Sequence, residues 1–415
     1  MPLDDSKIYI VGVGMTKFGL MPDRSIKEMV ETATTDALSD AGVQADQVEA
    51  VFYSNVGQGV IEGQVCVPGQ IALRPLGFES IPIVNVENAC ASGSTAAYLA
   101  CMQIRAGTAD IVMAIGAEKL STSDLDKRNS VFAGGYDVHD AEAVFAKLEA
   151  MAADAPAPPV EGARSPFMDI YSYWSRAYMK DFGATQRDLA EISSKNHWHS
   201  TMNELCQFQR TFTVDEVLSA RPLSYPLTVP MCSGFSDGAA AAVICSAAGV
   251  RKLRAEDRAI AIESIVLASG TQRDARDWDL HITRLAGDKA YRLAKIAPEE
   301  IDIAELHDAT AFGELLNAEN LRLVARGQGG PAVVSGETKL GGRIPINVSG
   351  GLESRGHPLG ATGLAQIHEL VVQLRGEAGT RQVRNARIGL FENGGGLLGV
   401  EEASAVVGIL SRLGY

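Results

Sequence analysis

The first 120 residues alternate between short apolar segments and amphipathic segments, and this alternation limits the chain to an α/β fold. Residues 7–13 (KIYIVGV) are predicted as a strand, and residues 25–41 as a helix with apolar positions three to four residues apart that stops at Gly42. Residues 47–55 and 109–118 are two further predicted strands. Strands separated by helices predict a parallel sheet with helices on its faces.

A weak internal repeat predicts that the chain contains two similar halves. Residues 41–55 (AGVQADQVEAVFYSN) and 294–308 (AKIAPEEIDIAELHD) share a helix end, a short acidic turn and a strand leading to a polar tip. Residues 233–246 and 393–410 each place a glycine-rich turn before a strand of small residues. Weak self-similarity is common among α/β chains, so the pattern alone leaves the duplication open.

Residues 121–230 break the pattern and are predicted to form an inserted cap. They contain a Pro/Ala-rich loop at 154–162 (DAPAPPVEG), followed by helices and polar turns. The predicted domains are an N-terminal half (1–120 plus 231–253), the cap (121–230) and a C-terminal half (254–415).

Composition argues against nucleic acid or a membrane as the main partner, although a local basic patch could still hold a phosphate. The net charge of −14 argues against nucleic acid or an anionic membrane surface, and no segment has the ~18–20 apolar residues that a membrane helix needs. The acidic N-terminus (MPLDDSKIYIVGVGMTKFG) does not have the form of a secretory signal, so a cytoplasmic protein is expected. The six cysteines show no C-x-x-C spacing, which predicts mostly buried free thiols without structural zinc.

Cys90 is the first candidate for chemistry. It follows residues 81–86 (IPIVNV), predicted as a buried strand, and precedes helix-forming residues that end at Gly107. Backbone N–H groups and the helix dipole at such a turn would lower the thiol pKa and stabilise an oxyanion. The alternative is a small buried side chain, which is the better explanation for Cys101 inside the same helix.

Two of the seven histidines lie in loops where a base would be useful. His307 (ELHDAT, 305–310) is predicted at the C-terminal tip of a strand, and His357 (SGGLESRGHPLGATG, 349–363) at a turn before a helix. A thiol nucleophile needs a base for its proton and donors for the oxyanion, although either histidine alone could be structural. His197 and His199 have no nearby third ligand, so no metal is predicted.

Together these segments resemble the thiolase superfamily, and in particular its branch related to sterol carrier protein. NACASGS is similar to the nucleophile loop, CSGFSDGAAAA to the coenzyme A loop, ELHDAT to the His-Asp motif of that branch, and GHPLGATG to a signature shared by most thiolases. The resemblance runs nearly from end to end. It implies the thiolase fold, with two similar α/β halves in a layered αβαβα arrangement and an inserted cap.

The resemblance also implies roles for individual residues. Cys90 would attack an acyl-CoA thioester, His357 would take its proton, and His307 would bind the carbonyl oxygen of the second substrate or the leaving enolate. Ser233 would contact the pantetheine arm. The N–H groups of Cys90 and of the glycines near Gly395 would form the other oxyanion hole. Coenzyme A would be a substrate, with no tightly bound cofactor.

One departure concerns the second catalytic cysteine of thiolases, which is missing. The two places where it is expected read FENGGG and HDAT, and no cysteine follows Cys245. Ala309 cannot move a proton. Glu392 falls on the first of these places, so we hypothesise that its carboxyl group, with a pKa raised by burial, is the substitute. The alternative is a glutamate at a strand end facing water.

The predicted reaction is CoA-dependent cleavage of a 3-oxoacyl-CoA, or the reverse Claisen condensation. A decarboxylating or other C–C bond-forming acyltransferase is one alternative. Another is a non-catalytic or partner-dependent subunit that binds acyl-CoA or lipid beside a small zinc-ribbon and OB-fold protein. The family implies a homodimer formed through the sheet edges, and a role in fatty acid, aromatic or sterol degradation.

The acyl group is harder to predict than the reaction. Four aromatic residues of the predicted cap, Phe167, Tyr171, Tyr173 and Trp174, favour a bulky or ring-bearing acyl group. The alternative is that they form the core of the cap.

Overall fold

The computed structural model describes residues 3–158 and 165–414. The strands are β1 (Ile8–Met15), β2 (Ala50–Ser54), β3 (Ile83–Val86), β4 (Ile111–Glu118), β5 (Pro222–Ser224), β6 (Leu227–Thr228), β7 (Gly238–Ser246), β8 (Ile260–Ser269), β9 (Ile303–Glu305), β10 (Ile388–Gly395) and β11 (Ser404–Arg412).

The helices of the first half of the chain and the cap are α1 (Ile26–Ala41), α2 (Gln58–Ile61), α3 (Pro68–Leu73), α4 (Ser92–Arg105), α5 (Leu125–Ala133), α6 (Ala141–Met151), α7 (Pro166–Phe182), α8 (Gln186–Ser200), α9 (Val214–Ser219) and α10 (Ala247–Leu253). Those of the second half are α11 (Ile282–Ala294), α12 (Ala311–Asn320), α13 (Gly329–Val334), α14 (Gly351–Arg355) and α15 (Thr362–Arg375).

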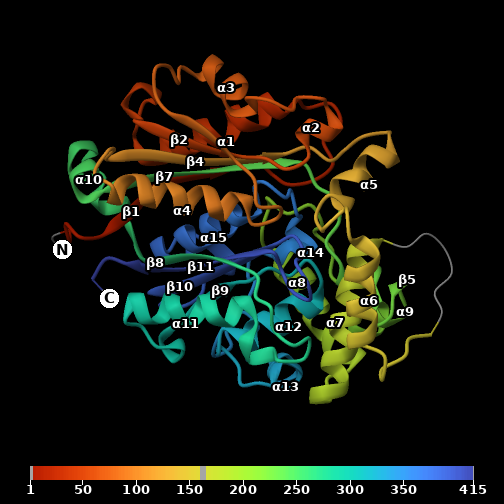
Figure 1. The fold of residues 1–415 in the computed structure, drawn as a ribbon. Coiled ribbons are helices and arrows are strands. Elements are labelled where there is room, and N and C mark those ends of the chain that lie inside the picture. Colours follow the sequence, from red (N-terminus) through yellow and green to blue (C-terminus); the bar gives the residue numbers. More distant parts are fainter. Residues whose placement is uncertain (1–2, 159–164, 415) are drawn as a thin grey trace.

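Five layers make up the body of the molecule (Figure 1). Helix α1 covers the outer face of one half-sheet, formed by β3, β2, β4, β7 and β1, and α11 covers the outer face of the other, formed by β8, β11, β10 and β9. Helices α4 and α15 contact each other between the two half-sheets. The predicted α/β class and the αβαβα layering are confirmed.

The topology shows the duplication directly. The strand order β3-β2-β4-β7-β1-β8-β11-β10-β9 is symmetric about the short antiparallel pairing of β1 with β8. In each half, the two pairs nearest this junction are antiparallel and the next pair is parallel. A parallel bridge between Ala304 and Ile346 stands where β3 stands in the first half. The repeated sequence unit also folds alike, because a 3₁₀ turn joins α1 to β2 (Ala45–Gln47) and α11 to β9 (Pro298–Glu300).

Two details of the predicted sheet are wrong. The sheet is mixed rather than parallel, because β7 and β11 each run antiparallel to both of their neighbours. Antiparallel pairs need no helical crossover, so β11 follows β10 directly as a hairpin. The segment at 81–86 is an edge strand rather than a buried one, with Val84 43% exposed on β3. The predicted homodimer through sheet edges stays a prediction, for which β3 offers an open edge.

Alternating side chains of the central strands supply separate cores. On β1, Ile8 and Ile10 pack with α4 and α15 in the middle layer, whereas Tyr9 and Val11 pack toward α1. On β11, Val406 faces the middle layer and Val407 the outer core beside α11. Strands buried on both faces read as continuous apolar runs, which is why the sequence reveals them so clearly.

The segment between β4 and β7 forms a helical cap whose aromatic core packs on the second half. Helix α8 contacts α12, α13 and α14, so the cap packs directly on helices of the second half. The predicted loop at 154–162 lies outside the described residues from 159 onward. Among the described residues, no helix combines the length and apolar character needed to cross a membrane.

The two halves meet closely at the turn between α14 and α15. The carbonyl of Gly360 accepts a hydrogen bond from Ser54 Oγ (2.7 Å), and its N–H donates to Glu118 (3.1 Å). A Cβ on Gly116 or Gly93 would lie 2.1 or 2.8 Å from the Gly360 oxygen, so both positions need glycine.

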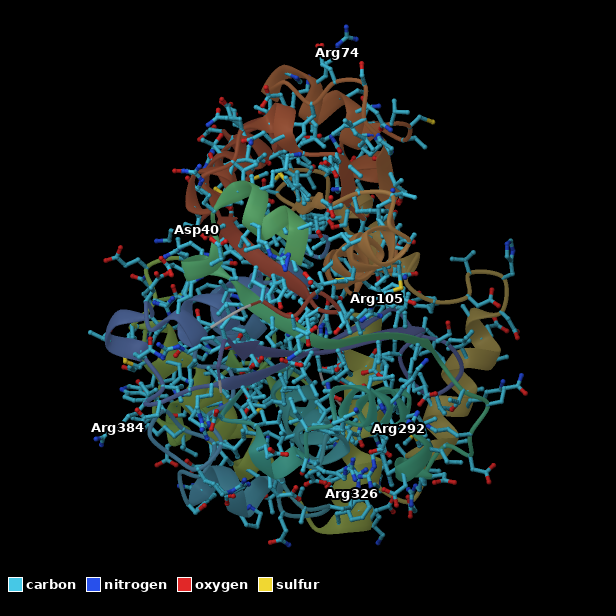
Figure 2. All side chains as sticks on the ribbon, turned by 90° about the vertical axis from the view of Figure 1, so that its left-hand side faces the viewer. Asp40, Arg74, Arg105, Arg292, Arg326 and Arg384 are labelled. Carbon is cyan, nitrogen blue, oxygen red and sulfur yellow. The ribbon has the colours of Figure 1, made fainter. Side chains whose placement is uncertain are left out.

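An ion pair holds another edge of the same interface. Asp40, labelled in Figure 2, lies at the end of α1. It pairs with Arg258 and with Arg375 from the second half. The Arg375 guanidinium also donates to the carbonyl of Val11 on β1 (2.9 Å). The interface therefore combines close backbone packing with charged hydrogen bonds.

We expect Gly116→Ala to lower the free energy of unfolding by about 1–3 kcal/mol, because the added methyl group would displace the Gly360 turn. Chemical denaturation measures this change. Gly59→Ala on α2 is the matched control, since its nearest neighbour would be 3.4 Å away and its stability should stay the same. Equal stability of the two variants would contradict this account of the interface.

Candidate active site

Cys90 lies on a strained turn between β3 and α4. Ala89 has a φ of 48°, a left-handed conformation that is unusual for a residue other than glycine. Ser92 Oγ stabilises the turn by accepting from Asn88 N (2.8 Å) and donating to Ala89 O (2.6 Å). Strain of this kind persists where the surrounding structure holds it, typically at functional sites.

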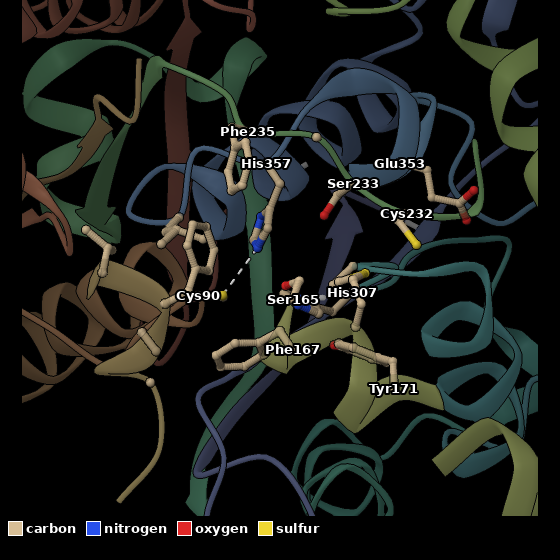
Figure 3. A pocket seen from close by; sticks show the side chains of 18 of the residues that line it. Cys90, Ser165, Phe167, Tyr171, Cys232, Ser233, Phe235, His307, Glu353 and His357 are labelled. Carbon is tan, nitrogen blue, oxygen red and sulfur yellow. Dashed lines mark hydrogen bonds between the residues drawn. The ribbon is translucent and has the colours of Figure 1, made fainter. Parts of the chain in front are cut away.

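His357 is placed to accept the thiol proton of Cys90. Its Nε2 lies 3.2 Å from Cys90 Sγ, and Figure 3 shows the two side chains directed at each other. Its Nδ1 lies 2.7 Å from Thr362 Oγ1, whose hydroxyl donates to the carbonyl of Pro358 (2.9 Å). Because the hydroxyl hydrogen is used there, Thr362 accepts from Nδ1–H, which leaves the Nε2 lone pair facing the thiol.

His307 has the opposite orientation. Asn393 Nδ2 donates to His307 Nδ1 (3.0 Å), while Asn393 Oδ1 accepts from Ser94 Oγ (2.7 Å). His307 therefore carries its hydrogen on Nε2 and is a hydrogen-bond donor. The rings of His307 and His357 lie edge to face, with centroids 5.2 Å apart.

The structure brings together the three predicted residues, Cys90, His307 and His357. Their ligand-type atoms all lie within 4.8 Å of one another, and no other cluster of three His, Cys, Asp or Glu side chains of this kind occurs among residues 3–158 and 165–414. A thiol and two imidazoles can also bind a metal. The contact between Cys90 and His357 is also the arrangement that a thiol nucleophile and its base require.

The resting pair is neutral. Burial, and next the negative charge of Glu118, raise the pKa of Cys90 to about 12, although the N–H groups of Cys90 and Gly396 act in the opposite direction. Burial lowers the pKa of His357 well below its usual value, and lowers the pKa of His307 to about 4. The expectation of a lowered thiol pKa at this turn is wrong, because desolvation outweighs the helix terminus.

The predicted oxyanion donors lie close to Cys90. The N–H of Gly396, with that of Cys90 itself, is directed at the sulfur. Gly395 lines the cavity one residue earlier, and a Cβ there would lie 2.4 Å from Asn88 O and 2.6 Å from Ala91 N. Glycine at 395 thus allows the end of β10 to pack directly on the nucleophile turn.

A cavity of about 770 Å³ leads to these side chains. Much of its wall is aromatic: Phe132 packs on Phe167 and Phe235 with ring centroids 6.3 and 5.3 Å apart. Of the four aromatic residues predicted to shape the pocket, Phe167 and Tyr171 line it. Tyr173 and Trp174 do not, and Trp174 is buried in the core of the cap.

Ser233 also lines the cavity, where its N–H donates to the carbonyl of Ala309 (2.9 Å). A contact with a pantetheine arm stays a prediction for this residue. The loop that follows supports the catalytic turn, because Ser236 Oγ accepts from His357 N (2.9 Å).

Glu392 is buried on β10 and does not face water. Its carboxyl group accepts from His307 N (3.1 Å) and Asn317 Nδ2 (2.9 Å), and it lies behind the cavity wall rather than in it. Burial, and next the charge of Glu402, raise its pKa well above the usual value. A raised pKa was expected for Glu392. The role of Glu392 as the substitute for the missing cysteine stays a prediction.

Several residues with clear roles in this site were not identified from the sequence. Thr362 orients His357, and Asn393 with Ser94 orients His307. Thr362 lies inside the quoted GHPLGATG motif, five residues after His357, so its position was a usable signal. Asn393 and Ser94 are 299 residues apart, and no local pattern connects them.

A cysteine in contact with a histidine, beside a second histidine in the same cavity, is the arrangement that nucleophilic catalysis requires. The chain matches the family described as Thiolase, N-terminal domain over residues 8–248 and that described as Thiolase C-terminal domain-like over residues 267–412. The chain therefore belongs to the thiolase family, in its sterol-carrier-protein-type branch. The predicted enzyme class, an acyltransferase, is confirmed.

Relatives that match nearly the whole of this chain agree with this assignment. The chain is 37% identical over 412 residues to acetyl-CoA acetyltransferase of Methanothermobacter thermautotrophicus, covering 98% of this chain and 99% of that protein. It is 36% identical over 418 residues to human sterol carrier protein 2, covering 99% of this chain and 72% of that protein.

Solved structures share the fold at lower identity. The Ltp2-ChsH2(DUF35) aldolase superposes with a TM-score of 0.77 at 22% identity, covering 98% of each chain. Human mitochondrial 3-ketoacyl-CoA thiolase superposes with a TM-score of 0.71 at 17% identity, covering 98% of this chain and 99% of that one.

We expect the rate of Cys90 alkylation by iodoacetamide to rise about tenfold per pH unit from about pH 6 to about pH 9, because the thiolate fraction grows in this way below the thiol pKa. Peptide mass spectrometry follows Cys90 separately from the exposed Cys66. A rate that stays constant over this range would instead indicate a thiolate–imidazolium pair at rest.

Proposed function

We propose that the enzyme transfers acyl groups of CoA thioesters through a covalent acyl-Cys90 intermediate. The reaction that fits best is cleavage of a 3-oxoacyl-CoA by coenzyme A, or the reverse condensation. The observation that carries the proposal is the 3.2 Å contact between Cys90 Sγ and His357 Nε2 within the cavity. The acetyl-CoA acetyltransferase named among the relatives supports the same class of reaction.

The first step is transfer of the acyl group to the enzyme. As Cys90 Sγ attacks the carbonyl carbon, its proton passes to Nε2 of His357, which is free to accept because the lowered pKa keeps the ring neutral. The developing oxyanion is stabilised by the N–H groups of Cys90 and Gly396. A positioned base contributes about 10²–10⁴ to such a rate, and each oxyanion donor about 10²–10³.

The second substrate would be oriented by His307. Its Nε2–H is the donor that remains after Nδ1 accepts from Asn393. A neutral imidazole donates one hydrogen bond to a carbonyl or enolate oxygen without bringing a charge into the cavity. The lowered pKa of His307 keeps it in this neutral form at physiological pH.

Coenzyme A would enter past positively charged side chains. Arg210 and Arg221 are exposed and line the cavity, in a protein whose net charge is −14. The Arg210 guanidinium lies 4.6 Å from the centre of the Phe212 ring, which restricts its position at the opening. Arginine is well suited to phosphate groups, so we assign the diphosphate of CoA to this side.

Intact-protein mass spectrometry after incubation with a panel of acyl-CoA and 3-oxoacyl-CoA thioesters tests the proposal. We expect an acyl adduct on the wild-type protein and none on Cys90→Ser, because serine is a much weaker nucleophile beside a neutral histidine. The aromatic wall predicts that bulky acyl groups also form adducts. Bound CoA without an adduct on the wild-type protein would favour a binding subunit instead.

We expect Arg210→Ala to raise the KM for coenzyme A about threefold to tenfold while kcat stays the same, because the side chain contributes equally to ground-state and transition-state binding. The difference should shrink as salt is added, since the interaction is exposed. Arg384→Ala is the matched control. Arg384 is exposed on the loop that precedes β10 (Figure 2), whereas the other end of β10, at Gly395, lines the cavity. Steady-state kinetics at two ionic strengths measures both variants.

A partner-dependent enzyme is a second candidate. The Ltp2-ChsH2(DUF35) structure joins a protein of this fold to a DUF35 partner. We propose that a small CoA-binding partner would supply part of the binding surface in that case. Full turnover by the isolated chain would contradict this candidate, and restoration of turnover by a purified zinc-ribbon and OB-fold protein would support it.

A further inference from the structure

We infer that Glu402, held by His281, is the acid–base group that moves the C2 proton of the substrate in the C–C bond step. The inference rests on the proposed function and assigns to Glu402 the task for which this chain has no cysteine at either of the two places, FENGGG and HDAT, where thiolases carry one. It differs from the sequence-based hypothesis, which gave this task to Glu392.

The known parts of the site leave this task open. His357 serves the Cys90 thiol, and His307 is a donor whose other nitrogen accepts from Asn393. Ala309, beside His307 in the sequence, has no acidic proton. A further group with a proton-accepting atom at the cavity is needed.

Three carboxylates line the cavity: Glu87, Glu353 and Glu402. Glu87 is exposed and accepts from Ala89 N (2.6 Å), so it supports the nucleophile turn. Glu353 is placed near Cys232, on the side of His357 away from Cys90 in Figure 3. Burial, and next the charge of Asp308, raise the pKa of Glu353 well above its usual value, so it is a neutral acid.

Glu402 is buried and lines the same cavity as Cys90, His307 and His357. Only 5% of its surface is exposed, yet it lines the cavity just before β11. Gly394, also in the cavity wall, makes room for it, because a Cβ there would lie 3.0 Å from Glu402 Cγ. Its charge acts on His307 and on Tyr171, both of which line the same cavity.

His281 determines the charge state of Glu402. His281 Nε2 lies 3.1 Å from Glu402 Oε2, and its Nδ1 accepts from Thr283 N (3.2 Å), so the ring carries its hydrogen on Nε2, the nitrogen beside the carboxylate. Burial alone would raise the pKa of Glu402, but its contact with His281 lowers it below the usual value. The buried pair thus holds a carboxylate, while the neighbouring Glu392 is held neutral.

The proton balance of the condensation then closes. Cys90 gives its S–H proton to His357, which passes it to the departing CoA thiolate as the acyl–Cys90 bond forms. Glu402 takes a proton from C2 of the second acyl-CoA, and the resulting enolate attacks the acyl–Cys90 carbonyl. The C–S bond to Cys90 breaks, the Cys90 thiolate takes the proton back from Glu402, and both groups return to their starting forms. Cleavage is the reverse sequence.

Two measurements on one variant separate this role from a structural one. For Glu402→Gln we expect acetyl transfer from acetyl-CoA to Cys90 within about threefold of the wild type, because His357 serves that step. We expect exchange of the C2 protons of acetyl-CoA with deuterium from D₂O to fall about 100-fold or more. Formate added to Glu402→Ala should restore part of the exchange, which a purely structural role would not allow.

Glu392→Gln is the competing variant, with exchange expected within about threefold of the wild type because the amide replaces a neutral carboxyl group. Loss of exchange in Glu392→Gln with exchange retained in Glu402→Gln would overturn the inference in favour of Glu392. Equal loss of acetyl transfer and exchange in Glu402→Gln, without rescue of Glu402→Ala by formate, would overturn it in favour of a structural role. No adduct on the wild-type protein would instead refute the proposed function itself.

Discussion

The active site depends on the close contact of the Gly360 turn with the first half of the chain. Gly360 donates to Glu118 and accepts from Ser54, and Gly93 and Gly116 have no side chains that would hold it away. This contact places His357, from the second half, 3.2 Å from Cys90, from the first. Cys90 and His357 come from different copies of the duplicated unit, so their contact exists only when the two half-sheets are docked.

Burial determines the electrostatics of the site. It keeps the Cys90 thiol, His307 and His357 uncharged at rest, so that proton transfers occur when substrate is in place rather than before. The tautomer of each histidine is fixed by the residue at its Nδ1. Thr362 accepts a hydrogen bond from His357, whereas Asn393 donates one to His307. One imidazole is thereby a base and the other a donor. Glu402 is the exception to neutrality, and its charge is maintained by His281.

Sequence reasoning identified the site best where chemistry and local pattern coincide. Cys90, His307 and His357 each lie at a strand end or a turn before a helix, and the structure brings all three together. The prediction of a lowered Cys90 pKa was wrong because it considered the helix terminus without the depth of the cavity. Glu402 was overlooked because nothing near it in the sequence distinguishes it from Glu401, which pairs instead with Arg273.

The sequence by itself determined the α/β class, the positions of most elements and the repeat of helix, turn and strand, because these follow from local apolar periodicity and short-range turn signals. It also indicated, through their motifs, Cys90, His307 and His357, which the structure brings together. Only the tertiary structure decided the mixed direction of the strands and the protonation states of Cys90, His307 and His357. It also decided that Glu402, and not Glu392, lines the cavity. Those properties depend on contacts between residues hundreds of positions apart and on desolvation, neither of which leaves a periodic signal along the chain.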